Sequence, residues 1–254
     1  MAPSLLITDL DNTLVGDDRA TQTLNQQLQS RHSQFCLVYS TGRSLASTQE
    51  LMAERQLLTP DFLITGVGTA IYRWGSDSDS AQLSLDVHWA DRLSEGWQRG
   101  VISALAQQFE ALIPQPAGEQ NPWKLSFWLD SPEAEAIVLA LQTALAQQGH
   151  PAQVVFSSGR DVDILPELAN KGNATAYLQQ TVEIESAATI VCGDSGNDIS
   201  LFEQADWGII VQNAQPEMLQ WYNTCGRSGH YLARSPYAWG ILEGLNYFNR
   251  VVGK

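Results

Sequence analysis

Acidic residues occur in pairs at two points where an apolar, strand-like run ends. Asp9 and Asp11 follow LLIT, and Asp194 and Asp198 follow TIVCG. Acidic residues are poor strand formers and are rarely buried without a partner, so their place here calls for a chemical reason. Hard carboxylate oxygens suit Mg²⁺, which keeps several waters and takes few protein ligands. The two pairs therefore indicate a magnesium site.

Positive charge is scarce, and some of it lies beside these acids. The chain has only three lysines, of which Lys171 is expected just before or at the start of a helix. Thr41, Gly42 and Arg43 follow a second apolar run, FCLVYS. A metal ion and Lys171 would let neighbouring carboxylates stay ionised while an anion binds between them. The group as a whole is typical of an anion site.

The elements that must position these residues alternate between strands and helices. The pattern predicts strands at 5–8, 35–40, 62–65, 189–193 and 207–211, and helices at 21–30, 44–55, 171–180 and 197–204. GVGTAIY, after the third strand, predicts a turn and a hairpin. Such alternation is typical of a Rossmann-like α/β fold with a parallel sheet, whose ligands gather beyond the carboxyl ends of the strands. Asp9 and Asp11 would point to opposite sides of a regular strand, so the backbone must loosen after Asp9.

The middle of the chain has a different pattern. It predicts a polar loop at 76–80, one long helix at 89–110, a loop at 114–122, a strand at 123–129, a helix from about 131 to 148, and a hairpin of 154–158 with 161–165. We interpret residues 84–165 as an inserted α+β cap domain. Residues 1–83 and 166–254 would then form the core domain.

Composition narrows the function classes. The net charge is −14 and no basic stripe occurs, which argues against nucleic-acid binding. No apolar run reaches the roughly 18 residues of a membrane span, and the N-terminus lacks a basic-then-apolar signal pattern. The three cysteines show no CxxC spacing and are expected to be free thiols. We expect a cytoplasmic protein that uses neither nucleic acid nor membrane.

Four motifs in order resemble the haloacid dehalogenase superfamily of phosphotransferases. They are DLDNT from Asp9, STG from Ser40, NKGNA from Asn170 and GDSGND from Gly193. The resemblance implies that Asp9 is the nucleophile that forms an aspartyl-phosphate, and that Asp11 is the general acid and base.

Further site residues follow from the same resemblance. Thr41, Gly42 and Lys171 would bind the phosphate, and Mg²⁺ would be held by the four acids, Asp9, Asp11, Asp194 and Asp198. Arg43 and Asn197 are expected to contact the substrate.

The cap resembles that of the sucrose-6-phosphate phosphatases of cyanobacteria and plants. The likeness rests on EQNPWKLSFWLD, SSGRDVDILP and NKGNATAYL. By the two-residue period of a strand, Lys124, Ser126 and Trp128 share one face, opposite apolar neighbours. Asp161 and Asp163 likewise oppose Val162 and Ile164. We expect Lys124, Asp161 and Asp163 to bind the glucosyl part of the substrate, with Trp128 against a sugar face.

The resemblance thus implies a Mg²⁺-dependent phosphatase that releases sucrose and phosphate from sucrose-6-phosphate, the last step of sucrose synthesis. One alternative is a related sugar-phosphate or glycosyl-glycerate phosphatase with the same cap. Another is a non-catalytic partner of sucrose-phosphate synthase, although a pure scaffold would not need Asp9, Asp11, Lys171 and Asp194 together.

Overall fold

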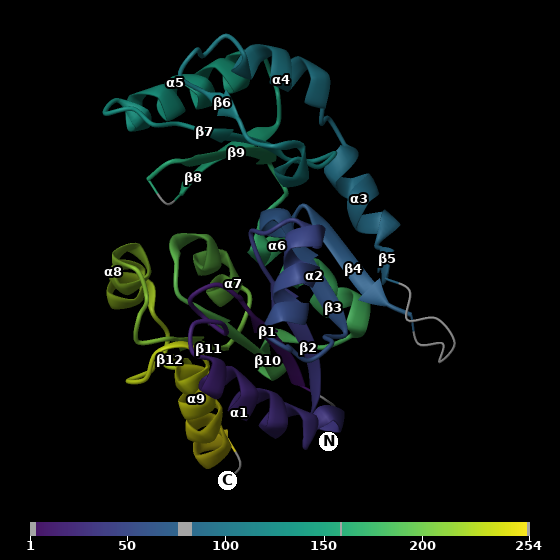
Figure 1. The fold of residues 1–254 in the computed structure, drawn as a ribbon, viewed down its shortest axis with the longest axis vertical. Coiled ribbons are helices and arrows are strands. Elements are labelled where there is room, and N and C mark those ends of the chain that lie inside the picture. The colour runs from purple at the N-terminus through teal and green to yellow at the C-terminus, as the bar shows by residue number, and fades with distance from the viewer. Residues whose placement is uncertain (1–3, 76–82, 158, 253–254) are drawn as a thin grey trace.

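The computed structural model describes residues 4–75, 83–157 and 159–252. These residues form an eight-stranded and a four-stranded sheet, each with its own helices (Figure 1). The loop predicted at 76–80 lies outside the described residues. The larger sheet is mostly parallel, so the predicted α/β fold with a parallel-sheet core is confirmed.

The larger sheet has the strand order β12-β11-β10-β1-β2-β3-β4-β5. Its strands are β1 (Ser4–Thr8), β2 (Phe35–Ser40), β3 (Phe62–Thr65), β4 (Ala70–Trp74), β5 (Leu83–Leu85), β10 (Thr189–Gly193), β11 (Trp207–Ile210) and β12 (His230–Leu232). The first three and the last three pair in parallel, while β4 returns against β3 as the predicted hairpin. Because β1 lies between β2 and β10, the chain changes direction along the sheet beside β1, which is where ligands bind in such folds.

Helices cover both faces of this sheet, because its central strands are apolar on both sides. Leu6 packs into one cluster, and Leu5 and Ile7 pack into the other. The cluster with Leu6 includes residues of α1 (Asp18–Gln29), α2 (Leu45–Glu54) and α9 (Tyr237–Val252). The opposite cluster includes residues of α3 (Val87–Ser94), α6 (Lys171–Val182), α7 (Ile199–Glu203) and α8 (Pro216–Cys225).

The smaller sheet is antiparallel throughout and lies beyond one end of the larger one (Figure 1). Its order is β6 (Ile113–Pro114), β7 (Leu125–Trp128), β9 (Asp161–Pro166) and β8 (Ala152–Ser157). Leu125 and Phe127 pack in one cluster with α4 (Arg99–Ala106) and α5 (Ala134–Gln147). Lys124 and Ser126 lie on the other face, as the strand period predicted.

The single long helix predicted at 89–110 is wrong. Two helices occupy this stretch, α3 and α4, and Gly96 lies between them with a φ of 71°. Only a residue without a Cβ adopts this left-handed conformation without strain. The periodic apolar pattern continued across the break and concealed it.

Smaller differences concern where elements begin and end. The helix predicted at 197–204 is a 3₁₀ turn, η5 (Gly196–Asp198), followed by the short α7. The strand predicted at 123–129 is limited to β7. The sequence patterns assigned no element after residue 211, where the structure has α8, β12 and α9.

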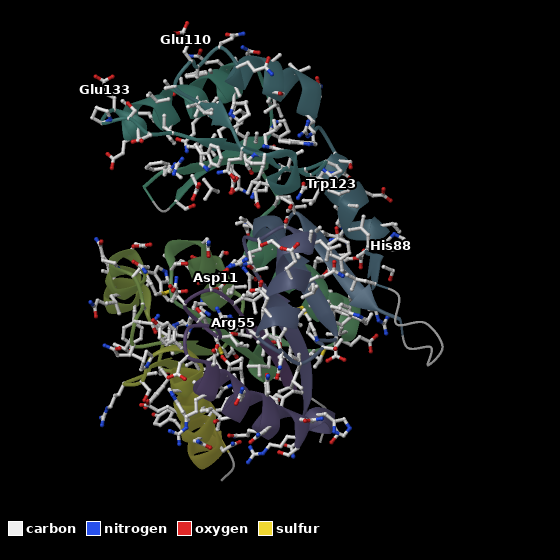
Figure 2. All side chains as sticks on the ribbon, viewed as in Figure 1. Asp11, Arg55, His88, Glu110, Trp123 and Glu133 are labelled. Atoms are coloured by element: carbon white, nitrogen blue, oxygen red, sulfur yellow. The ribbon has the colours of Figure 1, made fainter. Side chains whose placement is uncertain are left out.

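The packing of α3 bears on the boundary of the cap. Trp89 and Leu93 of this helix are buried in a cluster made mostly of residues from the larger sheet and its helices, which Leu165 of β9 joins. Trp123 meets the end of α3, where its indole Nε1 donates to Ser94 Oγ at 3.0 Å (Figure 2). We therefore propose that the cap begins near Gly96 rather than at residue 84.

No helix in the described ranges combines the length and the apolar character that crossing a membrane requires.

Candidate active site

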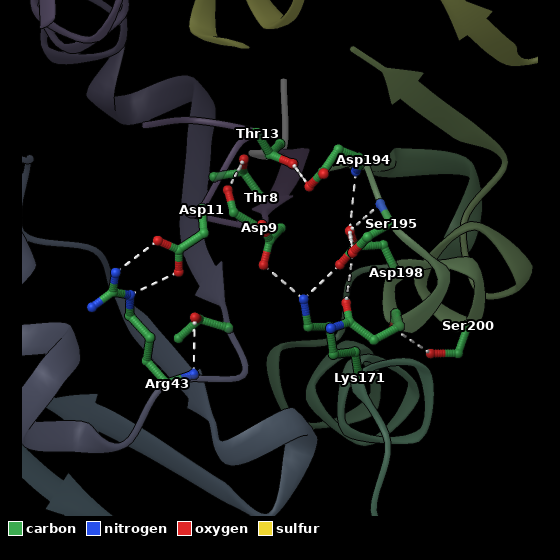
Figure 3. Close-up of polar contacts among 12 residues, drawn as sticks. Thr8, Asp9, Asp11, Thr13, Arg43, Lys171, Asp194, Ser195, Asp198 and Ser200 are labelled. Atoms are coloured by element: carbon green, nitrogen blue, oxygen red, sulfur yellow. Dashed lines mark hydrogen bonds and ion pairs between the residues drawn. The ribbon is translucent and has the colours of Figure 1, made fainter. Parts of the chain in front are cut away.

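The predicted core residues meet beyond the carboxyl ends of β1, β2 and β10 (Figure 3). Asp9 follows β1, Thr41 follows β2 and Asp194 follows β10. The fourth piece arrives on α6, whose N-cap Asn170 accepts through its side chain from Asn173 N at 2.7 Å. Parallel pairing brings these ends to one edge of the sheet, so residues far apart in the chain become neighbours.

Lys171 lies at the centre of this group and is fully buried. Its Nζ is 2.7 Å from Asp9 Oδ1 and 2.5 Å from Asp198 Oδ1. Burial alone would lower the pKa of this amine, but the charges of Asp198 and Asp9 more than offset that effect and hold its pKa above the ordinary value. Lys171 is therefore a fixed positive charge beside Asp9.

Three carboxylates crowd around this single amine. Oxygens of Asp9, Asp194 and Asp198 come within 4.8 Å of one another, and all three residues are buried. Burial raises the pKa of Asp9 to about 8, although Lys171 opposes this, and the charge of Asp198 adds to the rise. Burial and the same Asp198 charge raise the pKa of Asp194 to about 6. Three carboxylates share one ammonium, so the set carries an excess of negative charge, and its hard oxygen donors fit a divalent cation.

Two of these carboxylates are held in place by groups behind them. Thr13 Oγ1 donates to Asp194 Oδ1 at 2.8 Å. Asp198 Oδ2 accepts from the backbone N of Asp194 at 3.0 Å and of Ser195 at 3.1 Å. Asp9 Oδ1 is bound to Lys171, while no described residue donates a hydrogen bond to Oδ2. Asp9 also lines the cavity, so one of its oxygens remains available for chemistry.

Asp11 is placed differently from the other acids. The strand ends at Thr8 and Asn12 adopts a φ of 61°, so the backbone loosens after Asp9 as predicted. The Asp11 carboxylate then accepts from Arg43 Nε at 2.7 Å and from Nη2 at 2.8 Å. It is not one of the three clustered carboxylates, and its role as a metal ligand stays a prediction.

Two of the three residues expected to bind phosphate, Thr41 and Gly42, line the same cavity. Thr41 is buried, and its Oγ1 accepts from Arg43 N at 3.2 Å. Gly42 and Asn197 also line the cavity, while Lys171 and Asp198 are not among its lining residues. Asp9, Asp11 and Asp194 thus border one space with the loop 41–43, which is expected to hold phosphate and is called the phosphate loop below. Lys171 is enclosed behind Asp9.

The cap contributes the opposite wall. Lys124 Nζ is 3.4 Å from Asp163 Oδ1, which also accepts from Ser126 Oγ at 2.6 Å. Asp161 Oδ1 accepts from Gln115 Nε2 at 2.9 Å. All three predicted cap residues line the cavity, which has a volume of about 1140 Å³. Pockets of this order accept a drug-sized or sugar-sized ligand.

Sequence reasoning missed some of this lining, and the contact of Trp128 with a sugar stays a prediction. Gln115, Glu119, Val67 and Glu217 border the cavity as well. They come from loops, turns or helix starts, where no periodic pattern marks a face. Trp128 is not among the lining residues, and the guanidinium of Arg160 lies 5.0 Å from the centre of its ring.

The chain is similar to named phosphatases over nearly its whole length. It is 36% identical over 257 residues to probable sucrose-phosphatase 3a of Arabidopsis thaliana, which covers 96% of this chain but 59% of that protein. The chain therefore spans about three fifths of the length of this plant relative. It is 32% identical to the mannosylfructose-phosphate phosphatase of Agrobacterium fabrum, over 96% of both chains.

A solved structure agrees over nearly the whole length. It is the sucrose-phosphatase of Synechocystis sp. PCC6803 in complex with sucrose and phosphate, which is 50% identical. The TM-score is 0.88, and the match covers 98% of this chain and 99% of that one. A family model described as sucrose-6F-phosphate phosphohydrolase matches residues 2–249. The chain therefore belongs to the sucrose-6F-phosphate phosphohydrolase family, within the haloacid dehalogenase-like phosphatases.

Proposed function

We propose that this protein is a Mg²⁺-dependent phosphatase that hydrolyses sucrose-6-phosphate to sucrose and phosphate. The observation that carries the proposal is the shared cavity, which joins the carboxylate–lysine cluster to a polar wall of the cap. The 50% identity to a sucrose-phosphatase over almost the full length supports the same substrate class. A small phosphate ester would need only the core half of this cavity, so the polar cap wall favours a sugar.

The residues divide the reaction between them. Asp9 attacks phosphorus, and the bond from phosphorus to the sugar oxygen breaks as the aspartyl-phosphate forms. Asp11 gives its proton to the departing sugar oxygen and then accepts a proton from the water that attacks phosphorus. The bond from phosphorus to the Asp9 oxygen breaks in that second step and releases phosphate. Lys171 and Thr41 stabilise charge on the transferring group.

The acid cluster supplies the cation site in this proposal. Asp9, Asp194 and Asp198 would hold Mg²⁺, with Asp11 as the further ligand predicted from sequence. The bound cation would supply positive charge that keeps Asp9 ionised and offsets the charge of the phosphate. Arg43 and Asn197 border the phosphate side of the cavity and are proposed to contact the substrate.

The cap wall supplies the sugar contacts. Lys124, Asp161 and Asp163 offer a cation and two carboxylates, which match donor and acceptor needs of sugar hydroxyls. Gln115 fixes one carboxylate, while Ser126 and Lys124 fix the other. Groups held in this way lose little freedom when a ligand binds.

A panel of phosphate esters tests the proposal. Phosphate release is measured for sucrose-6-phosphate, mannosylfructose-phosphate, glucose-6-phosphate and fructose-6-phosphate, with Mg²⁺ and with a chelator. We expect the highest kcat/KM for sucrose-6-phosphate, and no turnover by Asp9→Asn. No Mg²⁺-dependent release from any ester would favour the non-catalytic partner of sucrose-phosphate synthase instead.

A second candidate substrate has one specific observation in its favour. The relative that matches over 96% of both chains acts on mannosylfructose-phosphate. A clear preference for that ester in the panel would replace sucrose-6-phosphate as the substrate and leave the chemistry unchanged.

A further inference from the structure

The turn η2 (Gly66–Gly68) holds the phosphate loop from behind. Gly66 N donates to the carbonyl of Arg43 at 2.8 Å, and Val67 N donates to the carbonyl of Thr41 at 3.1 Å. These two bonds bracket Gly42, the loop residue between them. A shift of η2 would therefore move the backbone that borders the phosphate end of the cavity.

The backbone of this turn is strained. Its three residues have φ values of 57°, 60° and 93°, and the middle one is the β-branched Val67. A β-branched residue is strained at positive φ and persists there only where its surroundings hold it. A Cβ on Gly66 would lie 2.3 Å from Thr69 Oγ1, and one on Gly68 would lie 2.3 Å from the carbonyl oxygen of Asn170. The turn is thus confined between Thr69 and the start of α6.

A side chain of the cap, that of Asn121, hydrogen-bonds to Thr69, the residue that follows this turn. Asn121 Nδ2 donates to Thr69 Oγ1 at 2.8 Å. The buried Thr69 in turn donates to the carbonyl of Gly66 at 2.9 Å. Asn121 lies between Glu119 and Lys124, which both line the sugar side of the cavity. A continuous set of hydrogen bonds therefore runs from the cap segment 119–124 to the phosphate loop.

The two ends of the Asn121 amide have separate partners. Its Oδ1 accepts from Trp123 N at 2.8 Å and so stabilises the turn within the cap. Among the described residues, its Nδ2 is the side-chain atom that crosses to the core. A substitution can therefore keep the local bond and remove the crossing one.

We propose that Asn121 is a positioning residue that ties the phosphate loop to the sugar-binding segment of the cap. Through Thr69 and η2, it sets the distance between the groups that recognise the sugar and the groups that hold the phosphate. The proposal rests on the function proposed above. Loss of this link should slow the hydrolysis of a substrate that fills both halves of the cavity. It should not slow the hydrolysis of a small aryl phosphate, which occupies only the phosphate end.

The test compares two substrates across a double-mutant cycle. Asn121→Asp keeps an acceptor for Trp123 N but has no donor for Thr69. Thr69→Val removes the acceptor from the other side, and Thr69→Ser keeps the hydroxyl as the matched control. The substrates are sucrose-6-phosphate and p-nitrophenyl phosphate, and kcat and KM are measured for each.

We expect either broken-link variant to lower kcat/KM for sucrose-6-phosphate by about tenfold, with part of the loss in kcat. The double variant should lose no more kcat/KM than the more impaired single variant, since both substitutions break the same Asn121–Thr69 bond. Hydrolysis of p-nitrophenyl phosphate should stay within about twofold and thereby report an intact phosphoryl site. Thr69→Ser should match the wild type.

Three results would overturn the inference. The first is an Asn121→Asp variant whose kcat/KM for sucrose-6-phosphate equals that of the wild type. The second is an equal loss of kcat/KM on both substrates, and the third is a double variant whose loss is the sum of the two single losses. A wild type that cleaves p-nitrophenyl phosphate but not sucrose-6-phosphate refutes the proposed substrate instead. The cycle is then run on the sugar phosphate preferred in the panel, where the same pattern is expected and its absence refutes the link.

Discussion

The ammonium of Lys171 is enclosed without exposure to water and contacts two carboxylates. Removing a charge from water costs several kcal/mol, and only close, well-oriented partners repay that cost. Asp198 supplies one partner and is itself fixed by backbone donors. Asp9 supplies the other and faces the cavity. The lysine is therefore part of the structural core as well as of the candidate site.

Replacement of this amine by an apolar group of similar length should affect both roles. Lys171→Met leaves the carboxylates of Asp9 and Asp198 without their cation, so we expect the free energy of unfolding to fall by about 3–5 kcal/mol at pH 7.5. We also expect phosphate release to fall by at least about a thousandfold. Urea denaturation and a phosphate-release assay measure the two effects.

The double variant Lys171→Met/Asp198→Asn is the control, and it should recover part of the stability but none of the activity. A Lys171→Met protein as stable as the wild type would contradict this account.

At the scale of elements, the link between α3 and α4 joins the two packed clusters. Gly96 is left-handed here, and a Cβ added to it would lie 3.0 Å from a side-chain carbon of Pro151. Gly100, four residues later, is inside α4 and has open space around its Cβ position. The two glycines therefore predict opposite responses to the same substitution.

Alanine at each position tests this. Gly96→Ala should destabilise the protein by about 1–2 kcal/mol, because an L-residue is strained at its φ and Pro151 must also move. Gly100→Ala should stabilise the protein by roughly 0.5–1 kcal/mol, because alanine is the better helix former. Denaturant midpoints, with m-values checked for constancy, give both differences. Shifts in the same direction would contradict the placement of the helix break.

At the scale of the whole molecule, a net charge of −14 surrounds a cavity that already contains clustered acids. An anionic substrate is repelled by such a field unless local positive charge compensates. Lys171 and Arg43 provide part of it, and Arg43 is already paired with Asp11. A divalent cation in the Asp9, Asp194 and Asp198 cluster would make the cavity attractive to a phosphate ester.

The cluster also predicts how stability depends on pH in metal-free protein. The pKa of Asp9 is about 8 in the folded chain against an ordinary 3.8, so the folded state binds more protons than the unfolded state between those values. Its contribution to the free energy of unfolding is therefore largest below about pH 4 and falls as pH rises toward 8. Asp194 acts in the same direction up to about pH 6.

Chemical denaturation of chelator-treated protein from pH 5 to pH 8 measures this effect. His230, whose pKa is lowered mainly by burial, gives an opposite slope, so the wild type is compared with Asp9→Asn. We expect the stability of the wild type relative to Asp9→Asn to fall as pH rises. Added Mg²⁺ should stabilise the wild type more at pH 8 than at pH 5, because its ligands are then deprotonated. If the stability of the wild type relative to Asp9→Asn instead rose between pH 5 and pH 8, the raised pKa of Asp9 would be refuted.

The sequence was most informative where local pattern and topology agree. The acids of the core site and Thr41 stand directly after predicted strands, and Lys171 stands at a predicted helix start. Parallel pairing alone brings such positions together. The alternation in β7 and β9 likewise placed Lys124 and Asp163 on the face of the cap sheet that borders the cavity. The chemical roles of these residues remain predictions, while their proximity is a property of the fold.

Other features depend on contacts that no local pattern encodes. Gln115 and Glu119 come from a loop without period, and Asn121 meets Thr69 only because two distant segments fold together. The break at Gly96 was hidden by apolar residues that continue on both sides of it. The pairing of Asp11 with Arg43 depends on the left-handed Asn12, which the residue type permits but does not require.

The return of the chain from β9 to α6 has a consequence for protein engineering. β9 ends at Pro166, and Lys171 follows five residues later, with Gln153 Nε2 of β8 donating to the carbonyls of Pro166 and Glu167 on the way. A chimera that receives a foreign cap has its entry junction near Gly96, where the left-handed glycine must be retained. The exit junction carries a stricter condition, because it sets the position of Lys171. A graft that lengthens the segment 166–170 by one residue would rotate the first turn of α6 and move the Lys171 amine away from Asp9. A chimera with a new substrate specificity must therefore keep the length of this segment.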